Sequence, residues 1–345
     1  MKQKNSKYYE YEWVGDGPIK AGVTLGEGHT PLTWSKQMGV WIKHEEMNPT
    51  GCFKDRESAV VVSKAIELGY KQISIISSGN AALSTAAYAQ KAGLQCTAYV
   101  PAKTTKAKKQ LIELFGAEVV ERSGFYEDVY HHVVDHPNAG IWNVTSGQNP
   151  WRVEGNKSIA YEIYDVLGHV PDMVVAPAGN GGCIAGIWRG FDEIQKMGKA
   201  IKVPKMIAVQ VEGADPLQQA LKQGKSWVNL DQVDDSVAEG IVAAESYCSP
   251  KAIEAITQSG GWVVGVSDEE IIESLGGLVS TESLITEPTS AAAFAGLKKL
   301  DVLAGEEVVV INTGSGMKML DEIKELVANH SQINDKMKGE YDRAN

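Results

Sequence analysis

Short apolar runs alternate with longer amphipathic stretches along most of the chain, and this alternation restricts the possible folds more than any other feature. The longer stretches carry apolar residues at three- and four-residue spacing, as amphipathic helices do. This order predicts an α/β fold with mostly parallel sheets flanked by helices. The predicted strands are Ile73–Ser77, Cys96–Val100, Glu118–Glu121, Ile141–Val144, Met173–Pro177, Met206–Val211, Trp262–Val266 and Val308–Asn312. The predicted helices are Asp55–Leu68, Ala81–Ala92, Lys106–Phe115, Glu154–Leu167, Cys183–Met197, Asp268–Leu278, Ser290–Leu300 and Met317–Val327.

The length of the chain, 345 residues, favours two domains, because a single hydrophobic core rarely grows to that size. Closely spaced strand and helix patterns between Ile73 and Val144 predict a small, mobile domain over residues 71–145. Residues 1–70 plus 146–330 would then form a large domain, and residues 331–345 a polar tail. A cleft between two such domains is a common place for a ligand.

The composition excludes several classes of function. The formal net charge is −11, whereas a nucleic-acid-binding surface needs a basic stripe. The four cysteines have no zinc-type spacing, and no apolar run is long enough to span a membrane. We therefore expect a cytoplasmic protein with reduced thiols that acts on a small molecule and binds neither metal, membrane nor nucleic acid.

The first candidate site is the segment Asn48-Pro-Thr-Gly-Cys-Phe-Lys-Asp-Arg56, which ends in the first turn of a predicted helix. Lys54 is unusual there, because a helix N-terminus already carries partial positive charge. That field and desolvation would favour a neutral, nucleophilic amine. The alternative is a solvated surface lysine between Asp55 and Arg56.

The second candidate site is a glycine-rich loop between the strand Met173–Pro177 and the helix that follows it. Gly179, Asn180, Gly181 and Gly182 allow backbone N–H groups to converge on an anion at the helix N-terminus. The loop is neither a Walker motif nor a dinucleotide fingerprint. It predicts phosphate binding, with a simple tight turn as the alternative.

Two further loops follow predicted strands, at Ser77-Ser-Gly-Asn80 and at Asn312-Thr-Gly-Ser-Gly316. The N–H groups of the first could hold a carboxylate, with ordinary helix capping as the alternative. The hydroxyl in the second could face a ligand, with a glycine turn as the alternative. All four loops nevertheless lie at strand ends, where α/β sheets bind ligands. A lysine nucleophile beside a phosphate-binding loop suggests a phosphorylated carbonyl cofactor, of which pyridoxal phosphate (PLP) is the common one.

These motifs resemble a known family. The sequence NPTGCFKDR at residues 48–56 closely resembles the NPTGSFKDR segment of threonine synthases, which are fold-type II PLP enzymes of the tryptophan synthase β superfamily. The resemblance runs nearly end to end. Its other segments are GEGHTPL at 26–32, NPWRVEG at 149–155 with Lys157, EPTSAA at 287–292 and TGSGMK at 313–318.

The resemblance implies that Lys54 holds PLP as a Schiff base and transfers protons, in a cleft between two domains of which the larger binds the cofactor phosphate. It also implies a homodimer. The residues implied to bind the cofactor are Lys54, Phe53, Asn80, Gly179, Asn180, Gly181, Gly182 and Thr313. The residues implied to bind the substrate are Ser77, Ser78, Gly79, Ala81 and Ala82 for its α-carboxylate, and Lys108, Asn149 and Arg152 for a distal anion.

The departures from the family motifs lie on the substrate side. The family's STGNTS loop reads SSGNAA, so methyl groups at Ala81 and Ala82 replace two hydroxyls. Each lost hydrogen bond to a charged group is worth roughly 1.5–3 kcal/mol. The family's KDRG reads KDRE with Glu57, and the serine before the phenylalanine is Cys52. The cofactor is therefore better defined than the substrate.

The leading functional prediction is a threonine synthase, a PLP-dependent lyase that converts O-phosphohomoserine and water into threonine and phosphate. Three alternatives stay open. They are a β-replacement on O-phosphoserine of the cysteate synthase type, a threonine or serine ammonia-lyase, and a PLP-binding protein without catalytic activity.

Overall fold

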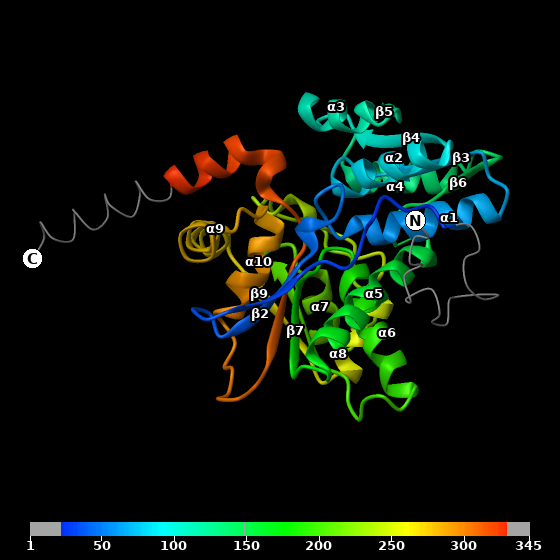
Figure 1. Cartoon of the computed structure of the whole chain (residues 1–345). Coiled ribbons are helices and arrows are strands. Elements are labelled where there is room, and N and C mark those ends of the chain that lie inside the picture. Colours follow the sequence, from blue (N-terminus) through cyan, green and yellow to red (C-terminus); the bar gives the residue numbers. More distant parts are fainter. Residues whose placement is uncertain (1–21, 148, 330–345) are drawn as a thin grey trace, which may run out of the picture.

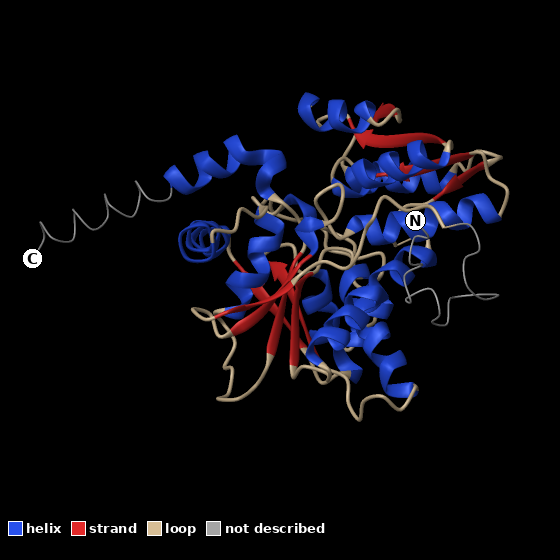
Figure 2. Ribbon diagram, in the orientation of Figure 1, coloured by secondary structure: helices blue, strands red, loops and turns tan. Residues whose placement is uncertain are grey.

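The computed structural model describes residues 22–147 and 149–329, and their strands form two separate sheets (Figures 1 and 2). The larger sheet has six strands in the order β1-β2-β10-β7-β8-β9, and all but β1 run parallel. Its strands are β1 (Leu32–Ser35), β2 (Val40–His44), β7 (Met173–Pro177), β8 (Lys205–Val211), β9 (Trp262–Val266) and β10 (Val308–Asn312).

Helices cover both faces of the six-stranded sheet, which explains the continuous apolar runs of its central strands. One face packs against α9 (Asp268–Glu282) and α10 (Pro288–Leu297). The other packs mainly against α5 (Pro150–Leu167), α6 (Gly182–Lys196) and α8 (Ser249–Gln258). A short helix, α7 (Pro216–Lys222), lies beside α8.

The smaller sheet is entirely parallel, in the order β5-β4-β3-β6. Its strands are β3 (Gln72–Ile76), β4 (Gln95–Pro101), β5 (Glu118–Arg122) and β6 (Ile141–Asn143). Helices α2 (Asn80–Ala92), α3 (Lys106–Leu114) and α4 (Tyr126–Asp135) surround it. Helix α1 (Lys54–Glu67) packs on both α2 and α5, so it joins the two halves of the molecule (Figure 1).

The mixed α/β fold with mostly parallel sheets is confirmed, and each predicted strand lies within one residue of its expected limits. Helix α5 begins four residues earlier than predicted, because Asn149 caps it and Pro150 occupies its first turn. The last predicted helix is split into a 3-10 turn, Gly316–Met319, and a helix over residues 320–329. The domain limits stay a prediction, and the tail at 331–345 lies outside the described residues.

Candidate active site

Lys54 is the first residue of α1 and follows the carboxyl end of β2. The loop before it is shaped by Asp55, whose buried carboxylate accepts hydrogen bonds from Thr50 N and Thr50 Oγ1, both at 2.6 Å. Gly51 takes a positive φ of 79°, which favours glycine. The Lys54 side chain is 20% exposed, so its amine is partly accessible to solvent.

A buried cluster of four charged side chains fixes the base of α1. Arg56 donates to Glu45 Oε2 at 2.6 Å and to Glu162 Oε1 at 2.7 Å, and Lys43 Nζ lies 2.5 Å from Glu162 Oε2. Burial alone would raise the pKa of Glu162, but Arg56 and Lys43 outweigh it and lower the pKa to about 2. Two cations therefore balance two carboxylates, and this rigid neutral cluster holds the strand β2 and helix α1 together.

The Lys54 loop is hydrogen-bonded to the loop that follows β10. Phe53 N donates to Thr313 O at 3.0 Å, and Ser315 N donates to Gly51 O at 2.9 Å. Thr313 is buried, and its hydroxyl lies 2.7 Å from Ser290 Oγ at the start of α10. The predicted convergence of these two loops is thus present in the backbone itself.

Asn80 belongs to a second charged group beside Lys54. Its Nδ2 donates to Glu287 Oε2 at 2.8 Å, and its Oδ1 accepts from Lys318 Nζ at 2.6 Å. Lys318 Nζ also lies 3.3 Å from Gly51 O, which ties Asn80 to the Lys54 loop. Burial raises the pKa of Glu287, although Lys318 and Asn80 act in the opposite direction.

The glycine-rich loop joins β7 to the N-terminus of α6. Its carbonyl oxygens are used inside the protein: Gly179 O accepts from Ser246 Oγ at 2.6 Å, and Asn180 O accepts from Cys248 N at 3.0 Å. Gly181 has a φ of 79°, and a Cβ there would lie 2.6 Å from the Cβ of Ala252. A loop that needs glycine and ends at the free N–H groups of a helix fits a phosphate group such as that of PLP.

Glu57 connects Lys54 to this loop. The Lys54 amine donates to Glu57 Oε1 at 3.0 Å, and the same oxygen accepts from Asn156 Nδ2 at 3.0 Å. Asn156 Nδ2 in turn lies 3.2 Å from Gly182 O. The lysine and the glycine-rich loop are therefore linked through two side chains that the motifs left without a role.

The loop predicted to bind the substrate α-carboxylate lies at the N-terminus of α2. Gly79 is its N-cap residue, and Gly79 N donates to Ser77 Oγ at 3.2 Å. Ala82 is fully buried, while Ala81 O accepts a hydrogen bond from Thr85 Oγ1 at 2.7 Å. Ser78 completes the loop. Ser77 N, Gly79 N and Ala82 N are bonded within the protein, so the N–H groups of Ser78, Asn80 and Ala81 are the ones that could receive a carboxylate.

The three residues predicted to bind a distal anion are each engaged within the protein. Asn149 caps α5 by accepting from Trp151 N at 3.1 Å. Lys108 forms an ion pair with Glu239, and it is the most exposed of the three. The buried Arg152 guanidinium lies 3.3 Å from Glu57 Oε2. Their assignment to the substrate remains a prediction.

Sequence reasoning missed the roles of Glu57, Asn156, Glu287 and Lys318. Glu287 and Lys318 stand in motifs that were identified, but their common partner Asn80 lies more than 200 residues away. Glu57 was visible only as a departure from a motif. Partners that distant along the chain meet only in the folded protein.

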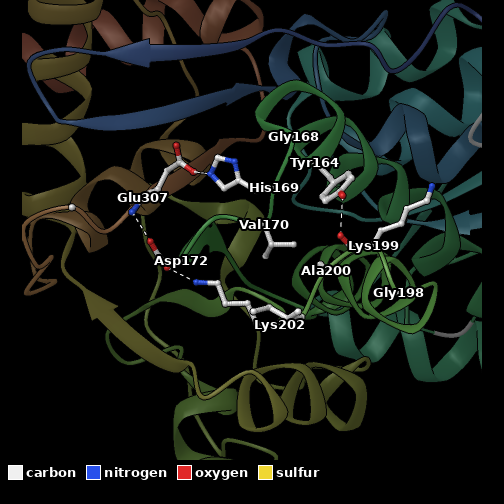
Figure 3. A pocket seen from close by; sticks show the side chains of 12 residues that line it. Tyr164, Gly168, His169, Val170, Asp172, Gly198, Lys199, Ala200, Lys202 and Glu307 are labelled. Carbon is white, nitrogen blue, oxygen red and sulfur yellow. Dashed lines mark hydrogen bonds and ion pairs between the residues drawn. The ribbon is translucent and has the colours of Figure 1, made fainter.

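A hollow lies beside the amino ends of β7 and β10 in the larger sheet (Figure 3). It has a volume of about 560 Å³ and is lined by residues just before β7 and β10, among them Asp172 and Glu307. Its polar groups are paired with one another: Lys202 with Asp172 at 2.5 Å and His169 with Glu307 at 2.7 Å. It lies at the amino ends of the strands, whereas ligands of α/β sheets bind at the carboxyl ends, where Lys54 is.

The chain belongs to the family of pyridoxal-phosphate dependent enzymes, whose family model matches residues 23–314. PLP is therefore its cofactor, and the chain is a PLP-dependent lyase of fold type II. It is similar to proteins named threonine synthase. One from Methanocaldococcus jannaschii is 36% identical, over 90% of this chain and 80% of the relative. Another from Methanosarcina acetivorans is 37% identical, over 86% of this chain and 76% of the relative.

Solved structures of other PLP enzymes share the fold. Threonine deaminase isoform 2 from Solanum lycopersicum has a TM-score of 0.73 and 24% identity, covering 86% of this chain and 87% of that one. A fungal L-serine ammonia-lyase from Rhizomucor miehei has a TM-score of 0.74 and 21% identity, covering 86% and 98%. Within the described residues, no helix is long and apolar enough to cross a membrane, and no group of side chains forms a metal site.

Proposed function

We propose that the protein is a threonine synthase, which converts O-phosphohomoserine and water into threonine and phosphate. The support is the identity of at least 36% to the two named relatives above over most of the chain, together with the Asn149–Gly155 segment that resembles threonine synthases in particular. The observation that carries the cofactor part of the proposal is the hydrogen bonding of the Lys54 loop to the loop after β10, with Asn80 tied to the same loop through Lys318.

Each residue on the cofactor side of the site would have one task. Lys54 would carry PLP covalently, with Phe53 packed beside it, since the Lys54 amine lies 4.4 Å from the Phe53 ring. The glycine-rich loop would hold the phosphate, Asn80 the ring oxygen and Thr313 the ring nitrogen. When bound, PLP withdraws electrons from the amino-acid carbon atoms and so makes their protons acidic.

Lys54 Nζ would then move the protons of the reaction. The amine would accept the proton from the substrate Cα and return protons to carbon as elimination and addition of water proceed. Glu57 holds the amine at 3.0 Å and can keep it oriented between these transfers. The N–H groups of the Ser77–Ala82 loop would bind the α-carboxylate, which orients the Cα proton toward the lysine.

The test begins with the cofactor. The purified protein should be yellow, should lose that absorbance on borohydride reduction, and should then carry the reduced cofactor on the peptide that contains Lys54. Lys54→Ala should lack the borohydride-sensitive band, whereas Lys91→Ala, a change at an exposed position on α2, should keep it. A covalently labelled Lys54→Ala protein contradicts the assignment.

The substrate is tested by product analysis. O-phosphohomoserine should yield equal amounts of phosphate and threonine with the wild-type protein and neither with Lys54→Ala. Phosphate release from O-phosphoserine with sulfite, in the absence of any reaction with O-phosphohomoserine, contradicts the proposal in favour of a cysteate-forming β-replacement.

A threonine or serine ammonia-lyase is the second candidate, and one observation favours it. Arg152 and Asn149 already have partners within the protein. A substrate without a phosphate would need neither of these groups. Formation of an oxo acid and ammonia from threonine or serine, without reaction of O-phosphohomoserine, distinguishes this activity from the first.

We also propose a homodimer in the cytoplasm, with residues 71–145 moving as a small domain toward residues 1–70 and 146–330. The four cysteines are free and buried, which suits a reducing compartment. Light scattering after size-exclusion chromatography measures the mass, and hydrogen exchange with and without substrate measures protection across the cleft.

A further inference from the structure

The carboxylate of Glu57 is placed to compete with an anionic substrate. It is 1% exposed, and it lies in the first turn of α1, where the resembling motif has a glycine. Besides Lys54 and Asn156 it has two further partners, Arg152 Nη1 at 3.3 Å and Ser146 Oγ at 3.2 Å. Burial alone would raise the pKa of Glu57, but Lys54 and Arg152 outweigh it and hold the pKa below its usual range. The group is therefore an anion at neutral pH.

Arg152 lies between this carboxylate and the substrate loop. Its Nη2 donates to Thr85 Oγ1 at 2.6 Å, and Thr85 stands one helical turn after Ala81. Its Nε donates to Val144 O. The guanidinium thus faces α1 on one side and the start of α2 on the other, and Glu57 supplies its negative counter-charge.

We propose that Glu57 is an internal competitor for anionic substrates: its carboxylate occupies Arg152 and must give up this guanidinium before a substrate phosphate can bind there. Glu57 therefore determines how strongly the site takes an amino acid with an anionic side chain relative to one with a neutral side chain. The inference rests on the proposed function in one respect, namely that Arg152 belongs to the distal part of the substrate site.

The test measures binding rather than turnover, so it does not depend on the reaction. Inorganic phosphate is titrated into the cofactor-loaded enzyme by calorimetry, and Glu57→Gln is expected to lower its Kd by about tenfold or more. Like charges about 4 Å apart repel strongly enough for this at an effective dielectric constant of about 20. The Kd of threonine, whose side chain is neutral, should change much less.

Further variants separate the effect of the Glu57 charge from misfolding and from a general gain in positive charge. Glu57→Gly restores the glycine of the resembling motif and should give the same gain in phosphate affinity. It therefore tests the inference even if Glu57→Gln folds poorly. Glu273→Gln instead frees the exposed Lys298, which has no predicted role in binding, and should leave the phosphate affinity unchanged. In the double variant Glu57→Gln, Arg152→Gln the gain should disappear.

An unchanged phosphate Kd in both Glu57 variants, or an equal gain in Glu273→Gln, overturns the inference. An equal gain for threonine and phosphate also overturns it, since Glu57 would then act on the whole site. If O-phosphohomoserine is not a substrate but the phosphate affinity rises selectively, the proposed function fails while this inference stands.

Discussion

Replacing Glu162 by glutamine should destabilise the protein by about 3 kcal/mol at neutral pH. Glu162 accepts from Arg56 at 2.7 Å and from Lys43 at 2.5 Å inside the buried cluster. A pKa that falls from 4.5 to about 2 on folding contributes about 3 kcal/mol, at about 1.4 kcal/mol for each pKa unit. Removing one member of a buried ion pair typically costs a similar amount, about 3–5 kcal/mol.

The pH dependence of this loss in unfolding free energy shows whether the Glu162 charge causes it. Because the pKa of Glu162 is depressed in the folded state, its contribution is complete above about pH 4.5 and is lost as the pH falls toward about 2. The difference in unfolding free energy between wild type and Glu162→Gln should therefore be constant from pH 7 to pH 5 and shrink below that range. Glutamine removes the charge but keeps the shape, so packing changes little.

Urea unfolding of the cofactor-loaded protein, followed by tryptophan fluorescence, measures this difference. The control is Glu113→Gln, which changes an exposed side chain on α3 and should shift the unfolding free energy by no more than about 0.5 kcal/mol. The reasoning is refuted if Glu162→Gln costs no more than the control, or if its cost is the same at pH 3.5 as at pH 7.

Two further substitutions and one thiol titration also have defined outcomes. Gly181→Ala should weaken PLP binding and cost more stability than Gly168→Ala, because both positions have positive φ but only the first would bring a Cβ within 4 Å of other atoms. Burial raises the pKa of Cys52 to about 12, so the native protein should show almost no thiol reaction at pH 8 and four thiols after denaturation. Tyr247→Ala should cost about 1 kcal/mol or more and speed amide exchange in α4, because it removes a ring stacked 3.7 Å from that of Tyr130.

The strands could be predicted closely from the sequence for a physical reason. Strands β7 and β10 are buried on both faces, so each is an uninterrupted apolar run with polar or glycine residues at its end. Helices α4, α7 and α8 were not predicted, and each of them has ten residues or fewer. Short helices depend on tertiary packing more than on their own pattern.

The site could be predicted only in part. The rule that parallel strands present their carboxyl ends at one edge places Lys54, Thr313 and the glycine-rich loop together at the six-stranded sheet. Asn80 follows β3 of the other sheet, so its position beside them does not follow from that rule. The partners of these residues do not follow from that rule. Asn80 binds Lys318, which is 238 residues further along the chain, and no local pattern links the two.

Two of the buried charged groups near Lys54 differ in their balance. Behind the lysine, Arg56 and Lys43 face two carboxylates, and this cluster is complete without a ligand. On the other side, Lys54 and Arg152 share the single carboxylate of Glu57. Once Lys54 is committed to the cofactor, Glu57 and Arg152 balance one against one. An anionic substrate must therefore break an existing pair, whereas a glycine at position 57 would leave the arginine free for it.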